Sequence, residues 1–98
     1  MTILYKIESD FEALIPKFME KRKKDVTDLE KAVTESDFEE VVSIGHKLKG
    51  NAGTYGFDAL SEIGANLENA GKAQNIDDIK KYVDEFRDHF SQIEIEFV

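Results

Sequence analysis

The spacing of the apolar residues is the feature that most constrains the fold of this 98-residue chain. Over most of its length, apolar side chains recur at steps of three and four residues, which places them on one side of an α-helix. No alternating strand pattern or internal repeat competes with this spacing. The pattern is clearest near the C-terminus, at Ile76, Ile79, Val83, Phe86, Phe90, Ile93 and Phe97. A seam of this kind is typical of a helix that packs nearly parallel or antiparallel to its neighbours.

The first long helix is expected to end at about Thr34. Pro16 lies inside its apolar pattern and removes one backbone hydrogen bond, so the helix either kinks there or breaks, and we expect a break near Ile15. The segment Ile3 to Ile15 then forms a short extra N-terminal helix. Ser9 begins an S-x-x-E pattern, which is typical of a capped helix start.

Three further helices follow from the start and stop signals. Ser36 begins a second S-x-x-E pattern, and Gly56 is expected to end that helix. The next helix runs from about Asp58 to Gly71, and Asn75 is the expected N-cap of the last one. Short connections force neighbouring helices to run antiparallel. The expected fold class is therefore all-α, an antiparallel up-down-up-down four-helix bundle.

Composition limits the classes of function. The chain contains 41% hydrophobic and 35% charged residues and is expected to form one ordered domain, residues 1–98. It has no cysteine, which excludes disulfides and thiolate nucleophiles. Its net charge of −8 repels nucleic acid and anionic lipid, so neither is an expected partner. Without a signal peptide or membrane-span pattern, we expect a cytoplasmic protein. The one basic cluster, Lys21 to Lys24, is interpreted as a solvated helix face.

The stretch GHKLKGNAGTYGFD, residues 45–58, contains four glycines within an expected helix. Glycine is less favourable than alanine by roughly 0.8–1 kcal/mol at each interior helix position. At about 100° per residue, His46 lies about 140° from the mean direction of the apolar residues on this helix. The imidazole is therefore expected to face water or a partner.

Lys49, Gly50 and Gly53 follow His46 by three, four and seven residues, which puts them on the same helical stripe. Val42 lies four residues before His46 on that stripe. We expect Val42, Gly50 and Gly53 to belong to a docking surface, where the missing side chains of the glycines let another protein approach closely. Gly45 is expected to serve helix packing instead.

A solvated imidazole titrates at about pH 6.5 and so has a ring nitrogen free to attack at physiological pH. Phosphoryl transfer chiefly needs in-line positioning and positive charge near the phosphoryl oxygens, which Lys49 could supply. The partner would then have to bring the phosphoryl group and any magnesium.

Two other kinds of site are less compatible with the sequence. Residues 45–50 have the spacing of a phosphate-binding loop, but Asn51 stands where that loop needs lysine, and no strand precedes it. A metal site would require His46 and His89 to meet across helices without an H-E-x-x-H or E-x-x-H pair. We therefore expect no metal site and interpret His89 as a structural residue.

The stretch around His46 resembles the histidine-containing phosphotransfer (HPt) domains of two-component phosphorelays. The helical architecture is similar over nearly the whole chain. The matching residues are His46, Leu48, Lys49, Gly50, Gly56 and Leu60, followed by Leu67 and Glu68.

The resemblance implies that His46 accepts a phosphoryl group from one receiver-domain aspartate and passes it to another. By the same resemblance, Lys49 steadies the phosphoryl oxygens and Gly50 leaves room for the receiver. Glu68 stands where the family often has Gln or Glu that hydrogen-bonds near the histidine, and Lys47 adds positive charge to the docking surface.

The implied partners are response-regulator receiver domains or a hybrid histidine kinase, and we expect a monomer. The chain itself is expected to bind no cofactor, with magnesium on the receiver, and to lack ATP-dependent kinase activity. The alternative is a helical binding module that regulates a receiver or kinase by docking, without carrying phosphate.

Overall fold

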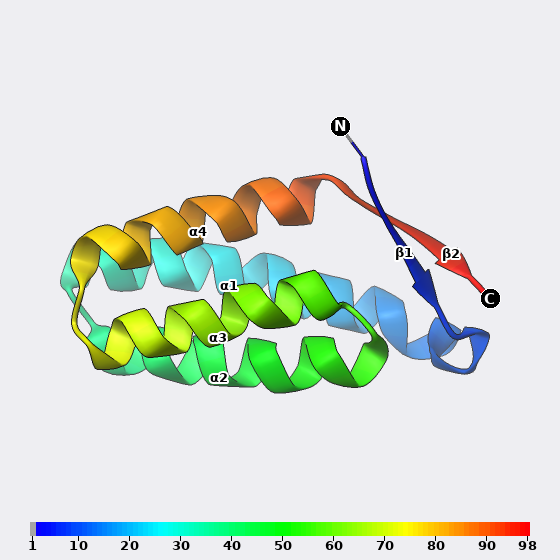
Figure 1. Cartoon of the computed structure of the whole chain (residues 1–98), viewed down its shortest axis with the longest axis horizontal. Helices are drawn as coiled ribbons and strands as arrows, with labels where there is room; N and C mark the ends of the chain where they lie inside the picture. Colours follow the sequence, from blue (N-terminus) through cyan, green and yellow to red (C-terminus); the bar gives the residue numbers. More distant parts are fainter. Residues whose placement is uncertain (1) are drawn as a thin grey trace.

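The computed structural model describes residues 2–98 and consists mainly of four helices. These are α1 (Ile15–Glu35), α2 (Phe38–Tyr55), α3 (Asp58–Lys72) and α4 (Ile76–Ser91). They lie side by side along the longest dimension of the molecule, and the connections between them alternate between its two ends (Figure 1). The residues that α2 and α3 bury recur mostly at three- and four-residue steps and include Val41, Ile44, Leu48, Ala52, Leu60, Ile63, Gly64, Leu67 and Ala70.

Three expected helix boundaries are confirmed. α1 begins at Ile15, with Pro16 in the first turn, where its missing N–H interrupts no helical hydrogen bond. α2 ends before Gly56, whose φ of 93° is a left-handed conformation that glycine adopts without strain. Asn75 caps α4, because its side chain accepts a hydrogen bond of 3.1 Å from the backbone N–H of Asp78.

Two other boundaries differ from expectation. Ser36 does not cap α2; it ends α1 in a left-handed conformation with φ 52°, and Asp37 accepts the capping hydrogen bond from the N–H of Glu40. Gly71 does not end α3, which continues to Lys72. A Cβ on Gly71 would lie 2.8 Å from Cγ2 of Val42, so this glycine lets α3 pack closely against α2.

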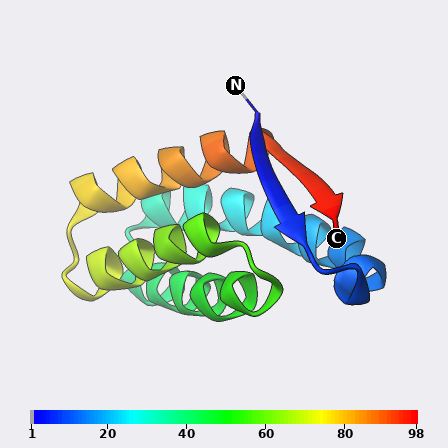
Figure 2. The ribbon, with the colours of Figure 1, turned by 45° about the vertical axis from the view of Figure 1, so that its right-hand side comes forward.

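The prediction of helix at both ends of the chain is wrong. Instead of an extra N-terminal helix, the structure has strand β1 (Ile3–Ile7), and the final helical seam stops before strand β2 (Ile93–Phe97). The two strands pair in parallel, Tyr5 opposite Ile95. Figures 1 and 2 show them beside each other at one end of the bundle, so the four helices together form the crossover that a parallel pair requires.

A 3-10 helix, η1 (Ser9–Leu14), connects β1 to α1. Ser9 makes no helix cap, contrary to its S-x-x-E pattern. Its hydroxyl and its backbone N–H both donate to the carbonyl oxygen of Val98, at 3.0 and 2.9 Å. The residue therefore ties the two chain ends together beyond the last paired residues of the strands.

The prediction that the basic cluster on α1 is a solvated helix face is wrong for one of its four residues. Arg22 is 2% exposed, whereas Lys21, Lys23 and Lys24 are exposed. Arg22 stands four residues after buried Phe18, so the helical period turns it inward.

Over residues 2–98, no helix is both long and apolar enough to span a bilayer.

Candidate functional site

His46 lies on the outer face of α2, and its side chain is 68% exposed. The buried residues Ile44, Leu48 and Ala52 hold the opposite face of the helix in the core. Helical geometry then directs the imidazole outward, as expected from the spacing.

Two glycines bring α3 close to this face. A Cβ on Gly45 would lie 2.6 Å from the backbone N of Glu68, and a Cβ on Gly64 would lie 2.5 Å from the backbone N of Lys49. Real Cβ atoms do not approach backbone so closely, so α2 and α3 can pack at this distance only with glycine at both positions. The short separation puts the Glu68 side chain within reach of His46.

The carboxylate of Glu68 joins the polar groups of the site. Its Oε2 lies 2.9 Å from Nδ1 of His46, and its Oε1 accepts a hydrogen bond of 3.0 Å from Nζ of Lys49. Nζ of Lys72 is 3.7 Å from Oε2. The Glu68 side chain is only 9% exposed. The hydrogen bond from Lys49 chiefly lowers the pKa of Glu68, and His46 and Lys72 act in the same direction, so this carboxyl is ionised at neutral pH.

Ionised Glu68 determines which imidazole nitrogen can react. A carboxylate only accepts hydrogen bonds, so Nδ1 of His46 carries the hydrogen. In the neutral ring, Nε2 then has the lone pair. The hydrogen bonds that His46 makes with the described residues involve Nδ1 alone, which leaves Nε2 available on an exposed side chain.

Of the two glycines expected on the docking surface, only Gly50 leaves open space next to His46. A Cβ on Gly50 would meet no atom within 4 Å, whereas one on Gly53 would lie 3.3 Å from Oγ of Ser61. Gly53 is exposed but borders α3. Lys47 is also exposed, and Val42 is half-buried against Gly71.

A protein-family model described as the Hpt domain matches residues 13–96 of the chain. The chain belongs to the Hpt domain family. Hpt domains act in phosphotransfer in two-component systems. Searches of curated proteins and of solved structures give no significant match.

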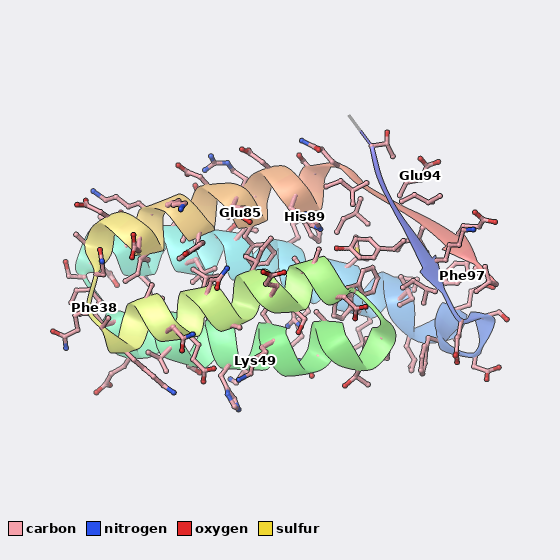
Figure 3. The ribbon with its side chains drawn as sticks, viewed as in Figure 1. Phe38, Lys49, Glu85, His89, Glu94 and Phe97 are labelled. Carbon is pink, nitrogen blue, oxygen red and sulfur yellow. The ribbon has the colours of Figure 1, made fainter. Side chains whose placement is uncertain are left out.

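The second histidine of this Hpt domain has different surroundings. Nε2 of His89 lies 2.6 Å from the hydroxyl of Tyr5, so the pair joins α4 to β1. Figure 3 labels His89 on α4 and Lys49 on α2, with α3 between them in that view.

Within the described chain, no group of three or more His, Asp or Glu side chains is placed to hold a metal ion.

Lys72 and Ser61 belong to the site of this Hpt domain but were not predicted. Lys72 lies one helical turn after Glu68, a spacing that could have indicated the ion pair. The hydroxyl of Ser61 donates a hydrogen bond of 2.7 Å to the carbonyl oxygen of Lys49, beside Gly53. No local pattern indicates this second contact, because it joins residues of different helices.

Proposed function

We propose that this Hpt domain relays a phosphoryl group between receiver-domain aspartates through His46. The observation that carries the proposal is the 2.9 Å contact between Nδ1 of His46 and Glu68, which leaves Nε2 as the free nitrogen of an exposed ring. The proposal takes the four helices as an up-down-up-down bundle. It also takes the protein as a cytoplasmic monomer that docks receiver domains or a hybrid histidine kinase.

In the transfer step, the lone pair of Nε2 attacks the phosphorus of a receiver aspartyl phosphate. An N–P bond forms while the P–O bond to the aspartate breaks, and the aspartate leaves as a carboxylate with the electron pair. Nδ1 keeps its hydrogen, and the positive charge that develops on the ring faces the Glu68 carboxylate at 2.9 Å. Transfer to a second receiver is the reverse reaction.

Lys49 has a second function in this proposal. The Lys49 side chain is 45% exposed, and its ammonium group donates to Glu68 but has three N–H donors, so it can also reach the phosphoryl oxygens. Magnesium is expected on the receiver, where it would neutralise charge on the same oxygens. The chain itself then supplies the nucleophile, one cation and an open surface at Gly50.

The test is to incubate the protein with a panel of phosphorylated receiver domains and to follow acid-labile, base-stable label. The chain has two histidines, which provide a matched pair of variants. We expect His46→Gln to take up no label and His89→Gln to keep it. Equal labelling of His46→Gln would overturn the proposal. Tight receiver binding by a wild-type protein that never takes up label would favour the binding module instead.

A further inference from the structure

A groove of about 240 Å³ between α1 and α2 is lined by basic and aromatic side chains that the proposed relay does not use. Lys17, Lys21 and Arg22 contribute three cations from α1. Phe18 of α1 and Tyr55 of α2 contribute aromatic surface, with ring centroids 5.4 Å apart. The groove therefore combines positive charge with apolar walls.

The charge of the groove contrasts with that of the rest of the protein. The chain has a net charge of −8, and other grooves on the described surface include carboxylates. Asp28 and Glu35 line one beside the start of α2, and Glu30 and Asp84 line one between α1 and α4. No Asp or Glu is among the residues that line the groove at Lys17 and Lys21.

Arg22 is the least expected residue of this groove. It is 2% exposed, with its guanidinium 5.2 Å from the ring centroid of Phe18. Its Nε lies 2.7 Å from Oδ2 of Asp25, and neither of these buried atoms makes a hydrogen bond to the other described residues. Arg22 lines the groove, and the two terminal nitrogens of its guanidinium carry four further N–H donors. An acceptor in the groove would pair with them.

The groove lies close enough to His46 for one partner to cover both. Asn51, which lines the groove, follows His46 on α2 by five residues, which is about 7.5 Å along the helix axis and about 140° around it. A standard protein interface covers about 800 Å² on each partner, equivalent to a disc of about 16 Å radius. A protein that docks on His46 and extends across α2 toward α1 would therefore cover the groove.

We propose that this groove binds a carboxylate side chain of the receiver domain that docks on His46. The carboxylate would accept hydrogen bonds from Arg22, with Lys17 and Lys21 beside it, in the planar geometry that arginine favours. An apolar neighbour of that carboxylate would pack on Tyr55 and on Leu14, which is 50% exposed. The volume suits a side chain, because pockets for drug-sized ligands usually span about 300–1,000 Å³. This inference rests on the proposed function, since it assumes that a receiver docks at His46.

The test compares two double variants of α1 that remove the same charge. Lys17→Gln with Lys21→Gln neutralises the groove, and Lys23→Gln with Lys31→Gln neutralises exposed lysines that do not line it. The probe is the unphosphorylated receiver domain that exchanges phosphoryl groups most rapidly with the wild-type protein. Arg22 is left intact in both variants, because it is buried and changing it would destabilise the fold.

We expect the groove variant to raise the Kd about tenfold and to weaken its salt dependence, with the control within about twofold of wild type. Equal Kd values for the two double variants would overturn the inference. A second comparison uses a receiver whose exposed carboxylates near its phosphorylated aspartate are changed to amides. If the groove variant loses as much affinity for this altered receiver as for the unchanged one, the inference is also overturned. Absence of phosphoryl transfer to the wild-type protein would instead contradict the proposed function, so the two failures are distinguishable.

Discussion

Gly45 of α2 and Gly64 of α3 lie so close that a Cβ on either would be within 2.9 Å of the carbonyl oxygen of the other. This contact sets the separation of the two helices at the level of the site. Glu68 is one turn beyond Gly64 on α3, and His46 is next to Gly45 on α2. The geometry that directs Nε2 of His46 outward therefore depends on two residues that have no side chain.

Gly45→Ala and Gly64→Ala should each destabilise the fold. The added methyl group would collide with backbone atoms, which cannot move aside as a flexible side chain can. Because the collision is with backbone, we expect a cost in the upper part of the usual overpacking range, about 2–3 kcal/mol, against a gain of about 1 kcal/mol in helix propensity. Urea unfolding should show a net loss of about 1–2 kcal/mol. An unchanged unfolding midpoint in both variants would show that the helices are not in close contact here.

Gly50→Ala should have the opposite effect on stability. A methyl group at this exposed position meets no atom, so we expect a gain of up to about 1 kcal/mol in the free energy of unfolding. The same methyl group would project into the proposed docking surface, and phosphoryl transfer should slow by about tenfold, or about 1.4 kcal/mol. A stabilised variant with wild-type transfer kinetics would place the receiver contact elsewhere.

Lys49→Gln should raise the pKa of Glu68, because the hydrogen bond from Lys49 is the largest cause of its depression. Lys72→Gln should raise it less. Since the folded pKa lies below the unfolded one, the ionised carboxyl stabilises the fold above the unfolded pKa, and this stabilisation is lost as the pH falls through the folded pKa. An NMR titration of the Glu68 carboxyl carbon measures both variants. A larger shift in Lys72→Gln than in Lys49→Gln would contradict the assignment.

His89 should make the fold sensitive to mild acid. Burial lowers the pKa of His89 from the usual value of 6.5, although Glu85 opposes the shift. Below about pH 6.5 the unfolded chain therefore binds a proton that the folded protein binds only at lower pH, so stability falls as the pH drops through this window.

The measurement is the free energy of unfolding between pH 7.5 and 5.5, in wild type and in His89→Gln. We expect a smaller decline in the variant, because the residue that takes up the proton is gone. Tyr5→Phe, which removes the hydrogen-bond partner at 2.6 Å, should lower stability at pH 7.5 by about 0.5–1.5 kcal/mol. The same pH dependence in wild type and His89→Gln would assign the acid sensitivity to another group.

Much of the candidate site could be predicted locally because it lies along one helix. His46, Lys49 and Gly50 occupy one stripe of α2, and the helical period alone determines that they face outward together. Glu68 entered through the family resemblance, and its contacts with His46 and Lys49 depend on the approach of a second helix. Ser61 could not be assigned to the site until that approach was known, whereas the spacing of Lys72 one helical turn after Glu68 could have indicated their ion pair.

The chain ends show where local spacing is ambiguous. Ile93 and Phe97 are four residues apart, which fits one face of a helix, but Ile95 between them makes an alternating pattern that fits a strand equally well. Ile3, Tyr5 and Ile7 have the same alternation. The outcome depended on pairing between segments about ninety residues apart, with Ile3 opposite Ile93.

The sequence by itself determined the four central helices, their caps at Gly56 and Asn75, and the outward direction of His46, because all of these follow from interactions within a few residues. The tertiary structure decided the parallel pairing of the two strands and the contact of Glu68 with His46. Both depend on how the helices pack and where the chain ends meet, and local spacing does not determine which distant segments come into contact.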